Sequence, residues 1–201
     1  VAPNLIYRWR RLMTEGGAVA VQADDAVMRS DLRWCSDGFE FTCWNGEIVR
    51  GAFVLDAHDR EAIAWRATAN AGISGSDIRD MMLEAVEARF GGIRAPHKVE
   101  WLSDNGSIYT ARETRVFASQ LNLVPCFTPV ASPKSNGMSE AFVKTLKRDY
   151  LRVGPVPDAK TALDQIAGSF DDYNEIHPHS GLRMRSPREF RRARQPAGVS
   201  G

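Results

Sequence analysis

The chain has 201 residues, of which 43% are hydrophobic, and its formal net charge is +1. This length and hydrophobic share suit one well-buried globular domain with appendages. No apolar run approaches the roughly 20 residues of a membrane-spanning helix, and no signal-peptide core opens the chain, so we expect a cytoplasmic protein without a membrane partner. Its three cysteines have no Cys-x-x-Cys spacing, which favours a reducing compartment. The near-neutral net charge argues against a strongly basic nucleic-acid-binding protein.

Residues 1–28 differ in pattern from the rest of the chain. A short helix is predicted from Leu5 to Met13 and ends at Gly16-Gly17, and a linker is expected from Val19 to Met28. One helix cannot bury its own apolar face, so it must pack on the core or on another chain. We therefore separate residues 1–28 from a core of residues 29–176.

The core begins with an antiparallel meander. Strands are predicted over 34–44, 47–55 and 61–68, and Asn45-Gly46 marks a tight hairpin between the first two. The first of these strands carries Asp37.

Helices then alternate with strands. A helix is predicted over 76–90, a buried parallel strand over 99–103 and a second helix over 110–121. The fifth strand, 123–127, contains Pro125, which places it at a sheet edge because proline cannot donate to a central ladder. Right-handed crossovers would put the fourth strand next to the first.

A long helix is predicted from Asn136 to Val153, and another over 158–174. Glu140, Lys144, Lys147 and Leu151 recur at helical spacing and are expected on one face of the long helix. Residues 177–201 read as a basic C-terminal tail over the surface. Six arginines crowd this tail: Arg183, Arg185, Arg188, Arg191, Arg192 and Arg194. Such local clusters can contact phosphates, although a solvated surface explains them about equally well.

Three acids stand out in this order of elements. Asp37 lies in the first strand, Asp104 directly follows the fourth, and Glu140 lies early in the long helix. Thirty-five residues, from Asn105 to Ser139, separate the last two acids. The topology places the aspartates on neighbouring strands, with the helix across that end of the sheet. Acids on three separate elements suit Mg²⁺, because a hard cation prefers oxygen ligands and keeps waters for its substrate.

Four sequence strings carry a resemblance to a known family. RWCSDGFEF surrounds Asp37, LSDNGSIYTA surrounds Asp104, and SPKSNGMSEAFVKTLKRDY contains Glu140; YNEIHPHSGLRMRSPREF lies near the C-terminus. Together, in this order and with this spacing, they resemble OrfB-type insertion-sequence transposases with a retroviral-integrase-like catalytic core. The resemblance implies an α/β, ribonuclease-H-like fold, with a mixed five-stranded sheet and helices on both faces.

The resemblance also implies a mechanism. Asp37, Asp104 and Glu140 would be the catalytic and metal-binding acids, holding two Mg²⁺ ions, with Mn²⁺ as a substitute. Water would cut a DNA strand at the element's end, and the freed 3′-hydroxyl would attack target DNA. Lys144 and Lys147 would contact DNA phosphates. The expected partners are the element ends and target DNA, further copies of the chain and an OrfA-type companion, at the bacterial nucleoid.

The front of the chain departs from that family pattern. VAPNLIYRWRRLMTEG resembles the last helix of the helix-turn-helix in the companion OrfA protein, which predicts an internally deleted, fused or trimmed product. Two alternatives to an active transposase therefore stay open: an inactive regulator that binds DNA or the transposase, and a general ribonuclease-H-type nuclease. The spacing of the acids and the closing motif disfavour the nuclease. His177 and His179 share no helix face across Pro178, so we expect a packing or hydrogen-bonding role there and no metal site.

Overall fold

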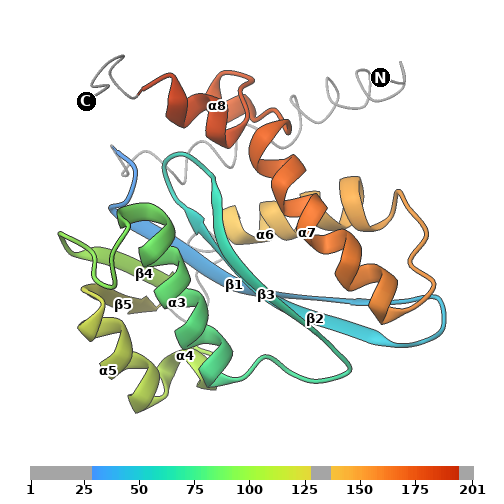
Figure 1. The fold of residues 1–201 in the computed structure, drawn as a ribbon, viewed down its shortest axis with the longest axis horizontal. Helices are drawn as coiled ribbons and strands as arrows, with labels where there is room; N and C mark the ends of the chain where they lie inside the picture. Colours follow the sequence, from blue (N-terminus) through green and yellow to red (C-terminus); the bar gives the residue numbers. More distant parts are fainter. Residues whose placement is uncertain (1–28, 128–136, 195–201) are drawn as a thin grey trace.

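The computed structural model describes residues 29–127 and 137–194 of the chain, and both ranges belong to one α/β unit (Figure 1). The helix and linker predicted within residues 1–28 lie outside the described residues. A five-stranded mixed sheet has the strand order β3-β2-β1-β4-β5, so β1 is its central strand. The predicted mixed sheet of five strands is therefore confirmed.

The meander is formed by β1 (Arg33–Thr42), β2 (Ile48–Asp56) and β3 (Ala62–Ala69), which pair in antiparallel fashion. The β1–β2 turn is longer than the predicted two-residue hairpin. The Cys43 amide donates to the Glu47 carbonyl at 2.7 Å, and Gly46 is the one residue of this turn with a positive φ, of 89°. Glycine adopts that conformation at little steric cost, so this residue sets the shape of the turn.

The second half of the sheet is parallel. β4 (Val99–Ser103) pairs with β1, and β5 (Leu123–Phe127) pairs with β4 at the sheet edge. Pro125 lies in this edge strand, as predicted, so its missing amide interrupts no central ladder.

Helices cover both faces of the sheet. α3 (Gly75–Phe90), α4 (Ser107–Thr110) and α5 (Arg112–Gln120) pack on one face, over a core that includes Trp34 and Trp101. α6 (Gly137–Thr145), the π-helical segment η2 (Leu146–Leu151) and α7 (Ala159–Glu175) share the second core. The predicted helices on both faces are confirmed.

An aromatic cluster holds α6 on the sheet. Phe142 of α6 lies with its ring centroid 4.5 Å from that of Phe53 on β2, and 4.7 Å from that of Tyr173 on α7. All three side chains are buried, so the position of α6 depends on how these rings pack.

The predicted helix face that contains Glu140 and the two lysines is wrong for one of its residues. Leu151, expected beside Glu140 and the lysines, is 4% exposed and belongs to the second core. The π-helical turns of η2 are wider than α-helical turns, so a residue that straight α-helical spacing would place outside faces inward. No described helix is long and apolar enough to cross a membrane.

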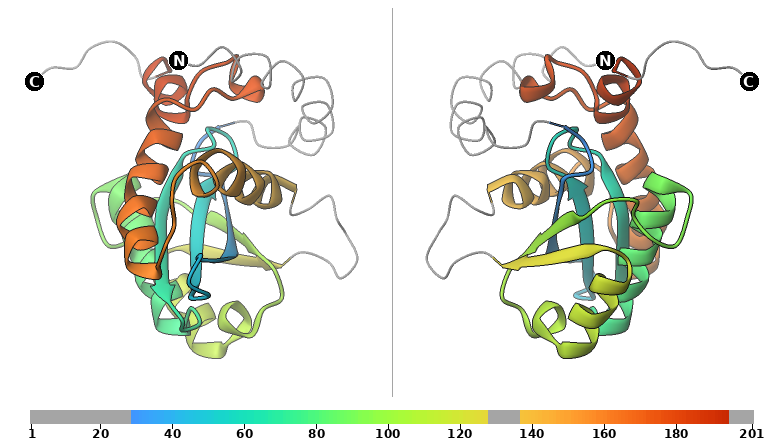
Figure 2. Two further views of the ribbon diagram at one scale, coloured as in Figure 1. Left: turned by 90° about the vertical axis from the view of Figure 1, so that its right-hand side faces the viewer. Right: turned by 90° about the vertical axis from the view of Figure 1, so that its left-hand side faces the viewer.

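The predicted surface tail is also wrong for its described part, residues 177–194. Those residues form the 3₁₀ turn η3 (Ser180–Leu182) and the helix α8 (Pro187–Arg192), which lies at the end of α7 (Figures 1 and 2). Leu182 and Phe190 are buried, and Ser186 and Glu189 form a capping box at the start of α8. This segment folds because its apolar side chains Leu182 and Phe190, which alternate with charged residues in the sequence, are buried against the rest of the protein.

Candidate active site

Sheet register brings Asp37 and Asp104 together. β1 and β4 run parallel, and the last paired residues are Cys35 and Leu102. Each aspartate lies two positions beyond its paired residue, so the same register places the two side by side. Asp37 is still within β1, whereas Asp104 directly follows β4, so the pair lies where β4 ends. This is the edge at which open α/β sheets commonly bind ligands.

Asp37 belongs to the face of the sheet that α6 covers. It pairs across β1 and β2 with Phe53, whose ring contacts Phe142 of α6. Asp104 lies in the turn that follows the neighbouring strand β4. The charges of both carboxylates act on the buried Tyr109 hydroxyl, so the two lie in one region, with Asp37 half-buried and Asp104 exposed.

Short local hydrogen bonds orient each carboxylate. Asp37 Oδ1 accepts from the amide of Gly38 at 2.7 Å, and Asp104 Oδ1 accepts from the amide of Gly106 at 2.9 Å. A Cβ at Gly106 would lie 2.9 Å from that same oxygen. Any side chain there would push the Asp104 carboxylate away, so glycine at this position keeps the carboxylate in place.

Glu140 is placed differently. It lies in the first turn of α6, exposed, while its neighbour Ser139 is completely buried. Within residues 29–127 and 137–194, no group of three or more acid, histidine or cysteine side chains is arranged to hold a metal ion. The sheet register brings the two aspartates side by side, and Glu140 lies on the neighbouring helix α6. The aspartate oxygens suit a hard cation, but the three-acid set is not assembled.

The two predicted lysines follow Glu140 along the same segment. Lys144 is exposed in α6, and Lys147 is half-buried in η2, where it lines a cavity beside β1. The positive charges of Lys144 and Lys147 therefore lie along the segment that leads from Glu140 toward the end of β1.

A hydrogen bond behind the aspartates was not predicted. The Tyr109 hydroxyl of α4 lies 3.0 Å from Ser36 Oγ, next to Asp37, and both side chains are buried. It joins the segment after Asp104 to β1, beyond the last backbone pairing of the two strands. Burial raises the pKa of Tyr109, and the charges of Asp37 and Asp104 add to the effect. The sequence indicates this contact only through the presence of a tyrosine shortly after Asp104, because a buried tyrosine hydroxyl needs a hydrogen-bond partner.

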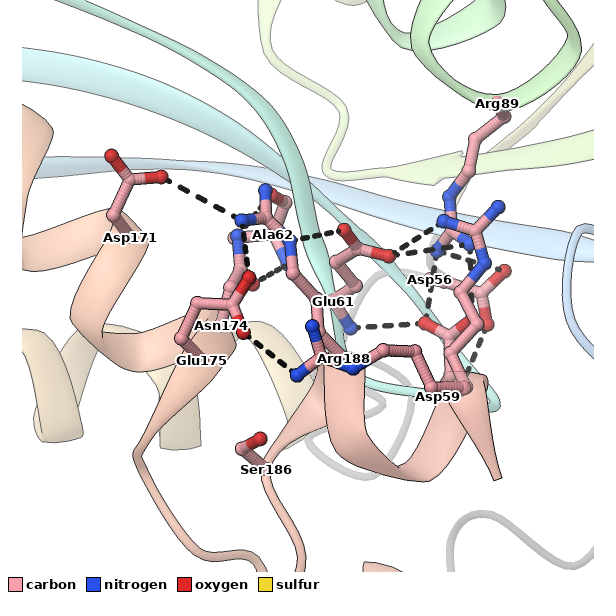
Figure 3. Close-up of polar contacts among 12 residues, drawn as sticks. Asp56, Asp59, Glu61, Ala62, Arg89, Asp171, Asn174, Glu175, Ser186 and Arg188 are labelled. Carbon is pink, nitrogen blue, oxygen red and sulfur yellow. Dashed lines mark hydrogen bonds and ion pairs between the residues drawn. The ribbon is translucent and has the colours of Figure 1, made fainter. Parts of the chain in front are cut away.

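The C-terminal arginines mostly serve the fold. Arg188 donates to Glu61 at 2.9 Å and to Glu175 at 3.1 Å (Figure 3), and Arg191 also donates to Glu61 at 2.9 Å. Glu61 further lies 3.4 Å from the buried Arg89, which makes a two-pronged contact with Asp59. These ion pairs fasten α8 to α7 and to the turn before β3, so those arginines are not an open phosphate-binding patch.

His177 and His179 pack as predicted. Their rings contact Tyr173, with centroids 5.6 Å and 4.9 Å from its ring. Burial lowers the pKa of His179 to about 3 and also lowers the pKa of His177. Both rings are therefore neutral around pH 7 and belong to the aromatic cluster behind α6.

Comparison with known proteins identifies the family. Residues 28–133 match the integrase core domain, and residues 123–187 match a second integrase core domain model. The chain is 73% identical over 168 residues to an uncharacterized protein of insertion element IS136 from Agrobacterium fabrum, covering 84% of this chain and 86% of that protein. It is 54% identical to a putative transposase InsD of insertion element IS2E from Escherichia coli, over 87% of this chain and 80% of that protein. It spans 58% of the length of another InsD transposase, for elements IS2A/D/F/H/I/K.

Solved structures share the fold at low sequence identity. A simian T-cell lymphotropic virus intasome, solved in complex with a PP2A regulatory subunit, is 17% identical with a TM-score of 0.64, covering 87% of this chain and 59% of that chain. The Mos1 transposase catalytic domain, solved with raltegravir and Mg, is 12% identical with a TM-score of 0.56. The match covers 85% of this chain and 84% of that chain. The predicted ribonuclease-H-like fold is confirmed. The chain belongs to the integrase core domain family, as the catalytic core of an insertion-sequence transposase.

Proposed function

We propose that this core cleaves and joins DNA strands with the help of a divalent cation held by Asp37, Asp104 and Glu140. The alignment of the two aspartates by the β1–β4 register is the observation that carries the proposal. Two neighbouring carboxylates, each oriented by a backbone amide, are a fitting start for a Mg²⁺ site. Glu140 completes the set when α6 brings its first turn toward the pair.

The chain's own residues would divide the work. Asp37, in the centre of the sheet, is the fixed ligand, Asp104 is the more exposed one, and Glu140 closes the site from the helix. Bound metal would lower the pKa of an attacking water and stabilise the leaving oxygen of the scissile phosphodiester. Lys144 and Lys147 hold neighbouring phosphates, which fixes the position of the DNA strand without reading its sequence. Water would cut the strand, and the released 3′-hydroxyl would attack a target phosphodiester.

Further features of the proposal come from relatives rather than from this chain. The HTLV-2 integrase core, 14% identical with a TM-score of 0.53, was solved with magnesium in a dimeric form. We infer that Mg²⁺ is the natural cation here, that Mn²⁺ replaces it, that two ions act, and that several copies assemble on paired DNA ends. An OrfA-type companion would assist end recognition at the nucleoid, in the cytoplasm.

The direct test is strand transfer on a branched oligonucleotide, in Mg²⁺ and in Mn²⁺. This assay needs the catalytic core and does not depend on recognition of the element's ends. The chain should join strands only with a divalent cation, and Asp104→Asn should abolish joining. Asp80→Asn, which changes an exposed acid on α3, is the matched control and should join normally. Equal joining by the Asp104 variant, or joining in excess chelator, would refute the proposal.

A further inference from the structure

The β1–β2 turn presents a large aromatic side chain to solvent. Trp44 is 72% exposed, although the other described tryptophans are buried or half-buried. Its backbone is nevertheless well fixed: its amide donates to the Val156 carbonyl at 3.0 Å, and that of Asn45 donates to the Pro157 carbonyl at 3.1 Å. Hydrogen bonds to the chain before α7 therefore hold the turn in one position. An exposed indole on a rigid support is suited to contact a flat partner.

A cavity of about 460 Å³ lies beside this tryptophan, and we call it the Trp44 cavity. It is lined by β1, the turn and η2 with the residues after it: Glu40, Phe41, Thr42, Trp44, Lys147, Leu151, Arg152, Gly154 and Val156. Its wall has one acid, Glu40, which is paired with Arg50 at 2.6 Å. Neither Lys147 nor Arg152 forms an ion pair with another described residue, so the Trp44 cavity has a net positive charge.

The Trp44 cavity lies on a continuous path from the proposed active site. α6 begins at the level of Asp37, because Phe142 contacts the Phe53 that pairs with it. The helix then runs along β1, since Lys147 lines the Trp44 cavity with Phe41 and Thr42. Glu140 and Lys147 are seven residues apart, or about 10 Å along a helix. A DNA strand a few nucleotides long would therefore reach from the acids to Trp44.

We propose that the Trp44 cavity binds an unpaired stretch of DNA strand, with a base stacked on Trp44 and phosphates beside Lys147 and Arg152. The inference builds on the proposed function and adds the kind of DNA that this core holds. Aromatic side chains combined with a positive groove are the usual means of binding single strands, because every base has a flat face. A base pair inside a duplex has no free face, so the site distinguishes unpaired from paired DNA.

The test measures binding of the full chain, without metal, to a labelled single-stranded oligothymidylate of about 12 nucleotides, a usual site size. Trp44→Ala should raise the Kd by about 5- to 150-fold, which corresponds to one stacked base. Trp44→Phe should retain most of the affinity, because a smaller ring still stacks. Thermal unfolding of both variants should match that of the parent chain, since the side chain is exposed.

Charge variants test the phosphate contacts. Lys147→Gln and Arg152→Gln should each reduce the slope of log Kd against log salt by about 0.7, the value for one phosphate of a single strand. Arg94→Gln and Lys98→Gln, at exposed positions before β4 and thus at the opposite end of that strand from Asp104, are matched controls with an unchanged slope.

Three results would overturn the inference. Trp44→Ala could bind the single strand as tightly as the parent chain, or it could lose affinity equally for a duplex of the same length. The loss could also follow a change in oligomeric state, which would make Trp44 a contact between copies. The binding assay contains no metal, so a failure of strand transfer would refute the proposed function and leave the inference about Trp44 standing. A core that joins strands, and whose Trp44→Ala variant binds single-stranded DNA normally, would refute only the inference about Trp44.

Discussion

The two aspartates and Glu140 are held in different ways. Backbone pairing of β1 with β4 sets the relative position of Asp37 and Asp104, and a buried hydrogen bond between Tyr109 and Ser36 reinforces it. Glu140 depends on a helix that side-chain packing fastens to the sheet, through Phe142 and the rings around it. Backbone pairing tolerates little adjustment, whereas a packed helix can shift. The position of the pair therefore depends on backbone pairing and the position of the third acid on side-chain packing, and substitutions in each region can test this difference.

The largest expected effect concerns the sheet-held pair. Asp37→Asn should lower strand transfer by about a thousandfold, because several kcal/mol of charge stabilisation depend on a metal ligand. The measurement is the rate of joining on a branched substrate, at equal occupancy by DNA. Thermal unfolding should change little, since Asp37 is only half-buried. A rate within tenfold of the parent chain would remove Asp37 from the site.

The next effect concerns the packed helix. Phe142→Ala should destabilise the fold by about 3–5 kcal/mol, as for other buried aromatic residues. It should also raise the concentration of Mn²⁺ needed for half-maximal joining, because α6 carries Glu140. Phe90→Ala is the control: Phe90 stacks on Trp34 in the other core, so its loss should cost stability without changing the Mn²⁺ requirement. Equal metal requirements in both variants would contradict the packing account of Glu140.

A pH measurement examines the same cluster. His179 is buried, and its pKa is lowered from 6.5 to about 3, so the folded protein holds it neutral while the unfolded chain binds a proton below pH 6.5. His179 therefore does not lower the free energy of unfolding above pH 6.5. As the pH falls from 6.5 toward 3, proton binding by the unfolded chain lowers that free energy. Replacing His179 with Gln should remove about 1–2 kcal/mol of that acid sensitivity between pH 6.5 and 5. Denaturant unfolding at both pH values gives the difference, and parallel curves for the two proteins would show that His179 is accessible to protons.

The last prediction concerns the hydrogen bond that supports the aspartates from behind. Tyr109→Phe removes only the hydroxyl and leaves the Ser36 hydroxyl without its partner, which should cost about 1–3 kcal/mol of stability. Because the bond joins the two aspartate-bearing segments, affinity for Mn²⁺ should fall as well. Thr114→Val removes another buried hydroxyl, one that donates to the Ile108 carbonyl within the same helical corner. That control should lose stability and keep its affinity for Mn²⁺, and an equal fall in both would reduce Tyr109 to a structural role.

Sequence reasoning placed the two aspartates because strands and crossovers are local patterns with few topological solutions. The meander, the buried strand after α3 and the proline at the edge all derive from alternation and composition. The burial of Leu151 could not be derived in that way, because the π-helical turns change which side of the segment faces the core. Glu61 with its arginines, and Tyr109 with Ser36, are contacts between distant segments, and no spacing in one sequence indicates them.

The central claim is that Asp37, Asp104 and Glu140 form one metal site, and calorimetric titration with Mn²⁺ tests it most directly. The parent chain should bind Mn²⁺, Asp104→Asn should bind it at least tenfold more weakly, and Glu140→Gln should also bind more weakly. DNA should strengthen Mn²⁺ binding by the parent chain more than by Glu140→Gln, if α6 closes on the pair. Equal Mn²⁺ affinities for the parent chain and both variants would contradict the assignment of these acids.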